Sequence, residues 1–527
     1  MKNIIICSDG TGNSTIKGRG TNVFKLFETV DLVGHRTNPD LTPQLAFYDD
    51  GVGTEDFKPL KVFAGMTGFG LSRNVKQLYK ELVRVYDPGD RIYLFGFSRG
   101  AFTVRTLAGL ITACGMIDAS RCETARSLEQ AVRNAYKAYR HRYRTEVAKL
   151  LRGDPDASIT ARFRKAYCLE DETTITFIGV WDTVDAVGLP FHIADVINLV
   201  FYRFKFPDRA LSKLVERACQ ALAIDEERQS FSPLLWQETP NDGKRIEQVW
   251  FAGAHSNVGG GYPKQGMSLV PFEWIMGKAE ESGLRFLGSD RASYREHVNV
   301  DDKLYDPRAG LGVFYRWKPR DIVQMCHEGS VCPKIHLSAL ERIARGTEDY
   351  APGNLPHDSK VIITPTGERD KDEALSERAR EVEAVLGSQP SGGASLLSRV
   401  ESEIVVGHIS YYLYVLVCVI VVIAASAPEG AATLIWPWRL LMNAGRLITY
   451  IATLQLSAII GSLKHLVASP SLVASLAGGF MTSYLLALFA DRRMSAVFSQ
   501  FWHKVQPKLR LALKRARKAS AEAERKS

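Results

Sequence analysis

The chain has 527 residues, which is too long for one ordinary hydrophobic core, so we expect more than one region. Its formal net charge is +9, but residues 491–527 hold 11 of the Lys and Arg residues and only three acidic ones. The remainder is nearly neutral, which argues against a nucleic-acid-binding protein and predicts a basic C-terminal tail. The eight cysteines are scattered and form no C-x-x-C pair, a pattern that favours free thiols in a reducing compartment.

The first residues predict a buried strand at 2–7 and no secretory signal, because the apolar run is short and ends in turn-forming residues. A Gly-rich loop follows, with Gly10, Thr11 and Gly12. Open α/β sheets bind ligands at such strand ends. The backbone N–H groups of these three residues could hold an oxyanion or a phosphate, and an ordinary turn is the alternative.

Strands then alternate with helices, which predicts a parallel, doubly wound α/β sheet. We expect a helix at 21–30, a strand at 45–48 and an amphipathic helix at 74–86. Residues 121–152 predict basic helices, whose charges we assign to a solvated face. Residues 201–222 predict a cap or lid of helices over the ligand site.

The segment at 91–113 predicts a strand, a tight turn and a helix, with Ser98 in the turn. Gly96 and Gly100 flank this serine in the G-x-S-x-G pattern of a nucleophile elbow, where larger side chains would collide with the strand and the helix. The sequence therefore predicts Ser98 as a nucleophile. The backbone N–H of Arg99, at the start of the helix, is expected to stabilise an oxyanion.

Two later strands each end at a residue that could complete a catalytic triad. The strand at 173–180 leads to Asp182 and Asp185, and we favour Asp182 because it lies closer to the strand end. The strand at 246–251 leads to His255 among several glycines. The order Ser98, Asp182, His255 is the one found in α/β-hydrolases.

Five motifs, in the same order, resemble the DUF2235 family, whose best-known members are Tle1-type phospholipase effectors of type VI secretion systems. The motifs are DGTGN at 9–13, GVGT at 51–54, GFSRGA at 96–101, GVWDTV at 179–184 and WFAGAHSNVGGGY at 250–262. The resemblance covers roughly residues 1–360. It implies an α/β-hydrolase fold and a Ser98–Asp182–His255 triad acting on phospholipid esters without a cofactor. The family commonly has Asp where this chain has Asn257, a position outside the triad.

The C-terminal part predicts membrane attachment. After a domain boundary at 364, residues 365–403 predict an exposed charged helix and a flexible linker. Residues 404–427 and 466–490 lack Asp, Glu, Lys and Arg and are long enough to cross a bilayer, and 447–463 is a weaker candidate. We expect a transmembrane region at 404–490 with two to four spans, followed by a basic tail at 491–527. Buried helices of a soluble domain are the alternative.

The absence of a signal and the basic tail favour a multi-pass protein of the inner (cytoplasmic) membrane with its catalytic domain in the cytoplasm, although the effectors it resembles reach the periplasm of another cell. Its expected partner is the phospholipid membrane, with no nucleic acid. The predicted function is a membrane-anchored serine hydrolase of the phospholipase A type. An esterase or thioesterase acting on a non-lipid ester, and a channel or membrane-disrupting module with a hydrolase-like sensor domain, are the alternatives.

Overall fold

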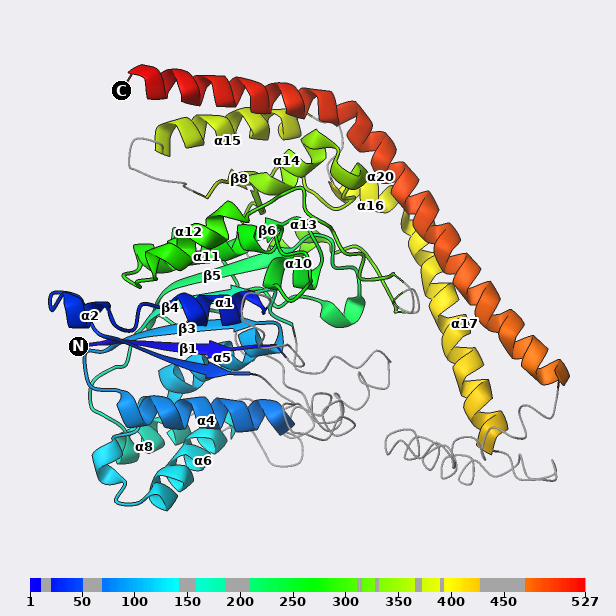
Figure 1. Ribbon diagram of the computed structural model, residues 1–527. Coiled ribbons are helices and arrows are strands. Elements are labelled where there is room, and N and C mark those ends of the chain that lie inside the picture. The colour runs from blue at the N-terminus through cyan, green and yellow to red at the C-terminus, as the bar shows by residue number, and fades with distance from the viewer. Residues whose placement is uncertain are drawn as a thin grey trace.

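A single parallel sheet of eight strands organises the part of the chain that the computed structural model describes, namely residues 1–10, 20–50, 69–141, 158–184, 209–309, 312, 315–327, 331–364, 372–388, 393–426 and 470–526. The strand order is β2-β1-β3-β4-β5-β6-β7-β8. The prediction of an α/β fold with a parallel sheet is confirmed (Figure 1). The strands are β1 (Asn3–Ser8), β2 (Gln44–Asp49), β3 (Arg91–Phe97), β4 (Ile175–Trp181), β5 (Val215–Ala223), β6 (Ile246–Phe251), β7 (Lys334–His336) and β8 (Lys360–Ile362).

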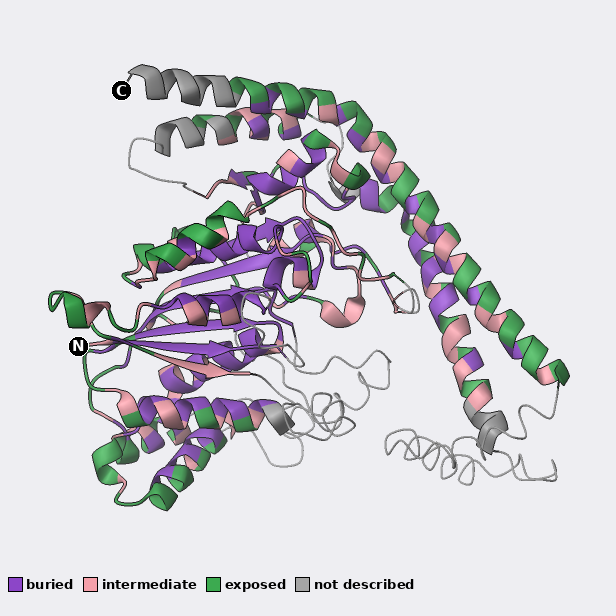
Figure 2. Ribbon diagram, in the orientation of Figure 1, coloured by how far each residue is buried: buried purple, intermediate pink, exposed green. Residues whose placement is uncertain are grey.

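Helices cover both faces of this sheet. Strand β1 is apolar on both sides, with Ile4 and Ile6 in one core and Ile5 and Cys7 in the other, which is typical of a strand covered on both faces. The first core is closed by α4 (Phe69–Val85), α5 (Arg99–Cys114), α6 (Ala125–His141) and α8 (Ser158–Tyr167), and the second by α1 (Asn22–Thr29), α10 (His255–Gly259), α11 (Leu269–Glu281) and α12 (Gly288–Glu296). Figure 2 shows the strands buried between these layers.

The remaining described helices lie at the edges of the sheet or beyond them. They are α2 (Gly34–Thr37), α13 (Ile322–His327), α14 (Leu337–Arg345), α15 (Asp372–Gly387), α16 (Gly393–Arg399), α17 (Glu401–Ser426) and α20 (Pro470–Lys526), with short 3-10 turns at Ala119–Arg121, Gln229–Phe231, Pro240–Asp242 and Thr347–Asp349.

The prediction of a helical cap at 201–222 is wrong for its second half, from residue 215 onward. Residues 201–208 lie outside the described part of the chain, whereas Val215–Ala223 forms strand β5, paired with β4 and β6. This strand is buried on both faces over most of its length, so its sequence has no alternation of polar and apolar residues, and its Ala and Leu residues favour a helix. Pairing on both sides overrides that local preference. In contrast, the basic helix predicted at 121–152 is present as α6, within the described residues up to 141.

Helices α17 and α20 pair side by side as a hairpin that leaves the sheet domain (Figure 1). Where they cross, the Ser410 and Ser483 hydroxyls each donate to the other residue's carbonyl oxygen, at 2.6 and 2.8 Å. In the described residues, these are the two helices long and apolar enough to span a bilayer, over Glu401–Val421 and within Pro470–Arg515. The weaker predicted span at 447–463 lies outside the described part.

Helix α20 continues without interruption from the hairpin onto the sheet domain. Trp502, Val505 and Leu509 are buried in one core with α14, and the Trp502 indole N–H donates to the Pro352 carbonyl oxygen at 2.6 Å. Helix α15 packs against α20 and buries Leu386 in the same core. The residues predicted as an exposed charged helix and a basic tail therefore pack against the sheet domain with one face each.

Candidate active site

The turn that carries Ser98 joins β3 to α5 and has the backbone of a strained elbow. Ser98 has φ 57° and ψ −122°, a conformation that side-chain-bearing residues rarely adopt. A Cβ on Gly96 would lie 2.6 Å from the Ala101 backbone, and one on Gly100 would lie 2.1 Å from the Ser8 carbonyl oxygen. Glycine at both positions is therefore required by the close approach of β1, β3 and α5, as the sequence predicted.

Asp182 follows the neighbouring strand at the same edge of the sheet. Phe97 and Trp181 are paired in register in β3 and β4, and the Ser98 N–H donates to the Trp181 carbonyl oxygen at 3.1 Å. Ser98 and Asp182 are consequently the next residues after two adjacent parallel strands. Asp182 is fully buried, with φ 38°, while the alternative acid Asp185 lies outside the described residues.

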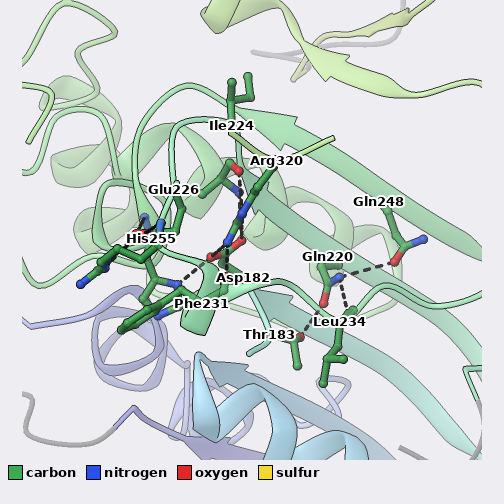
Figure 3. A network of polar contacts seen from close by, with 12 residues as sticks. Asp182, Thr183, Gln220, Ile224, Glu226, Phe231, Leu234, Gln248, His255 and Arg320 are labelled. Atoms are coloured by element: carbon green, nitrogen blue, oxygen red, sulfur yellow. Dashed lines mark hydrogen bonds and ion pairs between the residues drawn. The ribbon is translucent and has the colours of Figure 1, made fainter. Parts of the chain in front are cut away.

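His255 is brought to Asp182 by the loop after β6. Its Nδ1 lies 2.6 Å from Asp182 Oδ2 (Figure 3), and its backbone N–H donates to Glu226 at 3.3 Å. The imidazole contacts the rings of Phe97 and Phe231, whose centroids lie 4.6 and 5.1 Å from its own. Because Nδ1 is bound to the carboxylate, Nε2 is the nitrogen available to exchange a proton with a neighbouring group.

Arg320 is a buried partner of Asp182 that the sequence analysis missed. Its two terminal nitrogens donate to the two carboxylate oxygens of Asp182 at 2.7 and 2.9 Å, and also to the carbonyl oxygens of Ala223 and Phe231 (Figure 3). Burial alone would raise the pKa of the Asp182 carboxyl, but the charge of Arg320 and the hydrogen bonds from His255 and Arg320 hold it well below its usual range. No local motif marks Arg320, which lies 138 positions from Asp182 in the sequence.

The predicted oxyanion donors have different surroundings. Arg99 is the first residue of α5, where backbone N–H groups lack a partner within the helix. The Gly10 N–H donates to the carboxylate of Asp9 at 2.6 Å, and Asp9 also accepts a hydrogen bond from the Tyr48 hydroxyl at 2.7 Å. Thr11 and Gly12 lie outside the described residues. The oxyanion role of these residues stays a prediction.

Asn257, where the resemblance noted above leads us to expect Asp, is buried and holds the loop after His255 in place. Its side-chain oxygen accepts from the backbone N–H groups of Ala254 and Tyr305 at 3.3 and 3.2 Å, and its amide donates to the Lys303 carbonyl oxygen at 3.1 Å. An amide satisfies these partners without a buried charge. Within the described residues, no group of three or more His, Cys, Asp or Glu side chains could hold a metal ion.

Comparison with known proteins identifies the family. The family model described as type VI secretion system phospholipase effector Tle1-like, catalytic domain, matches residues 2–278, which is more than half of the chain. The chain belongs to the Tle1-like family. The matched region includes Ser98, Asp182 and His255, whereas Arg320 and the α17–α20 hairpin lie beyond it.

The relatives of this Tle1-like chain are distant in sequence. The uncharacterized protein YEL023C of Saccharomyces cerevisiae is 29% identical over an alignment of 253 residues, which covers 45% of this chain and 33% of that protein. The chain thus spans about a third of the length of this curated relative. A crystal structure of an uncharacterized protein from Pseudomonas aeruginosa matches 75% of this chain and 60% of its own, with 18% identity and a TM-score of 0.34. A structure of the Tle1 effector bound to the VgrG spike of the type VI secretion system matches 50% and 52%, with 19% identity and a TM-score of 0.28.

Proposed function

We propose that this chain is a membrane-attached serine hydrolase of the α/β-hydrolase class that cleaves acyl ester bonds of phospholipids. The observation that carries the proposal is the 2.6 Å contact between His255 and Asp182 at the edge of the sheet where Ser98 occupies a strained elbow. Membership of a family of Tle1-like phospholipase effectors supports the lipid substrate. Two of the three proposed catalytic groups thus share a buried hydrogen bond, and the third follows a strand adjacent to the one that carries Asp182.

The proposed reaction has two halves. In the first, Ser98 Oγ attacks the ester carbonyl while His255 Nε2 takes the hydroxyl proton, and the imidazolium is stabilised by the Asp182 carboxylate. The backbone N–H of Arg99, with one from Gly10 to Gly12, holds the oxyanion. His255 then returns the proton to the departing lysophospholipid oxygen. In the second half, water activated by His255 attacks the acyl-serine and releases the fatty acid and free Ser98.

The surface of the α17–α20 hairpin supports attachment to a bilayer. Large apolar residues of both helices are exposed, and such a surface is unfavourable in water and compatible with lipid. Helix α17 has 26 residues, enough to cross a hydrocarbon core of about 30 Å. The exposed residues include Val405, Ile409, Leu416, Met481, Leu485 and Phe489, all more than half exposed.

The packing of α20 on the sheet domain indicates on which side of the membrane the two ends of the proposed anchor lie. Helix α17 begins beside the sheet domain, and α20 returns to it and packs there through Trp502. The two ends of the hairpin therefore lie on the same side of any membrane that it crosses, which supports an even number of crossings in the proposal. The net positive charge of residues 491–527 favours the cytoplasmic side for both the tail and the catalytic domain.

Fatty-acid release from mixed phospholipid vesicles by the detergent-purified full-length protein tests this function. We expect release by the wild type and by Ser289→Ala, which alters an exposed serine on α12, and a loss of at least about a thousandfold in Ser98→Ala. Turnover of a soluble ester without fatty-acid release would replace the lipid substrate with a non-lipid one. Vesicle leakage that Ser98→Ala retains, with no ester cleaved, would favour the membrane-disrupting alternative.

A further inference from the structure

One short segment, residues 315–321, connects the base of the α17–α20 hairpin to the buried pair of Asp182 and His255. We propose that Arg320 is a positioning residue for this catalytic pair, and that Trp317, seated against α17, keeps Arg320 in place, so that the hairpin supports the active site as well as anchoring the protein. This inference rests on the proposed function, because it concerns the efficiency of the Ser98 reaction.

Arg320 fixes the orientation of the Asp182 carboxylate. Oδ1 accepts from Arg320 and from the Ala223 N–H at 2.7 and 3.0 Å, and Oδ2 lies 2.9 Å from Arg320 and 2.6 Å from His255 Nδ1. The planar guanidinium meets both oxygens at once, which sets the plane of the carboxylate and therefore the direction from which it holds the imidazole. Arg320 itself is only 4% exposed and is also bound to the Phe231 carbonyl oxygen at 2.7 Å.

Trp317 lies three residues before Arg320 and is seated under the hairpin. It is 1% exposed, and a Cβ added to Gly407 of α17 would lie 2.5 Å from its Cζ2. Only glycine therefore lets the helix approach the indole so closely. Trp317 shares one buried hydrophobic cluster with residues of α16, α17 and α20 and with the residue between α16 and α17, namely Leu396, Leu397, Val400, Ile404, Ala490, Met494 and Phe498.

Arg308, whose guanidinium lies over the Trp317 ring, links this region to α20 by an ion pair. The Arg308 guanidinium lies 4.5 Å from the centre of the Trp317 ring, pairs with Glu227 at 2.8 Å and also pairs with Asp491 of α20. Burial of Arg308 alone would lower its pKa, but the neighbouring carboxylates of Glu227 and Asp491 outweigh this and raise it, so the cation is retained. Trp317 thus contacts α17 directly at Gly407 and is linked to α20 through Arg308.

The segment also holds the residues around His255. The Lys318 N–H donates to the Glu227 carbonyl oxygen at 2.8 Å, and the Gln229 N–H donates to the Arg316 carbonyl oxygen at 3.0 Å. The chain at 226–231 is thereby paired with the segment, and it supplies Glu226 to the His255 backbone and the Phe231 ring to its imidazole. Both members of the catalytic pair are consequently supported from residues 315–321.

The chain offers a matched pair of glycines for the test. Gly407→Ala forces a methyl group into the Trp317 indole, whereas a Cβ at Gly478, in α20 of the same hairpin, meets nothing within 4 Å. In detergent-purified full-length protein acting on a soluble short-chain ester, we expect Gly407→Ala to lower kcat at least about tenfold with KM changed less than about twofold, because misplaced catalytic groups slow the chemical step. Gly478→Ala is expected to match the wild type. Because the ester is soluble, altered binding to the membrane cannot produce this difference.

A second set of variants acts on Arg320 directly. We expect Arg320→Gln to lower kcat at least about a hundredfold and Arg320→Lys to recover part of it, since an ammonium pairs with Asp182 but cannot meet both oxygens in one plane. The rate at which a fluorophosphonate labels Ser98 should fall in parallel, and thermal unfolding reports the folded fraction. Trp317→Phe, a milder change than Gly407→Ala, is included in case the latter does not fold.

The outcomes separate the two proposals. An active wild type with unchanged kcat in folded Gly407→Ala and Trp317→Phe would overturn the role of the hairpin, and unchanged kcat in folded Arg320→Gln would overturn the positioning role of Arg320. A wild type that neither cleaves an ester nor reacts with the fluorophosphonate would overturn the proposed function and this inference with it.

Discussion

Replacing Asp182 with Asn changes a buried charge while keeping the shape of the side chain. In the wild type, Asp182 Oδ2 lies 2.6 Å from His255 Nδ1 and must accept a hydrogen bond from it. An Asn side chain can present its NH2 group there, which would favour the imidazole form with its proton on Nε2, the form that cannot take the proton of Ser98. We expect Asp182→Asn to lower kcat by about 10³ to 10⁴, a loss typical of this change in Ser–His–Asp hydrolases.

The same substitution should also destabilise the fold, because it leaves Arg320 as a buried cation without its counter-charge. The two side chains are 0 and 3% exposed in the ion pair. Breaking a buried pair by removing one charge costs about 3–5 kcal/mol. Arg320 keeps its hydrogen bonds to the carbonyl oxygens of Ala223 and Phe231, so we expect a value near the lower end, about 3 kcal/mol.

The pH dependence of this destabilisation has a definite sign. The pKa of the Asp182 carboxyl in the folded protein lies below its unfolded value of 3.8, so the folded state binds fewer protons at this site. The stability that Asp182 contributes is therefore fully present above about pH 4 and is lost as the pH falls towards the folded pKa. The difference between wild type and Asp182→Asn should therefore shrink as the pH falls below about 4.

Denaturant unfolding of the detergent-purified proteins, followed by tryptophan fluorescence at pH 7 and pH 3, measures this difference, and kcat on a soluble ester is corrected for the folded fraction. The control is Asp290→Asn, which removes a partly exposed carboxylate from α12 that has no contact with Asp182, His255 or Arg320 among the interactions described above. The reasoning fails if folded Asp182→Asn keeps more than a tenth of the wild-type kcat. It also fails if the stability difference is the same at both pH values.

Two further changes test backbone strain and a buried charge. Ser98→Gly should be more stable than Ser98→Ala by about 1 kcal/mol and should unfold at a higher temperature, because φ 57° and ψ −122° strain any residue with a Cβ. Both variants should lack activity. Equal unfolding midpoints by differential scanning fluorimetry would contradict the strain. Lys25 is fully buried in α1, and its burial, only partly opposed by the charges of Asp9 and Glu28, lowers its pKa to about 7. Between pH 7 and the unfolded pKa of 10.5 the unfolded state binds more protons at Lys25 than the folded state does. The free energy of unfolding of the wild type should therefore rise by about 2 kcal/mol relative to that of Lys25→Met from pH 7 to 9. Parallel stability profiles of the two proteins in denaturant titrations would argue against this reading.

Local sequence patterns were sufficient for the strands and turns that carry the candidate site. A short apolar run followed by Gly-x-Ser-x-Gly has few backbone solutions, because the glycines allow an approach that any Cβ would block, and Ser98 indeed lies in such a turn. The strands before Asp182 and His255 were also recognisable: β4 is a largely apolar run that ends just before Asp182, and β6 ends in Val-Trp-Phe just before a Gly-rich loop. The membrane-length helices were also visible, since long stretches without charge are rare elsewhere.

Strand β5 and Arg320 could not be found in this way, because both depend on partners distant in the sequence. Residues 215–223 have the composition of a helix and become a strand because β4 and β6 leave one place between them in the sheet. Arg320 has no motif around it, and its importance comes from the buried carboxylate that it meets 138 residues away. The position of α20 likewise depends on the pocket that Trp502 enters beside Pro352.

The sequence by itself determined the elements of this protein: the parallel α/β alternation, the elbow at Ser98, the strand ends at Asp182 and His255, and the apolar C-terminal helices. These follow from backbone sterics and from the periodicity of apolar residues, which act over a few positions. Only the tertiary structure decided that Arg320 holds Asp182 and that the hairpin base is packed against Trp317. Contacts between buried groups depend on how whole elements pack together, and no local pattern encodes that geometry.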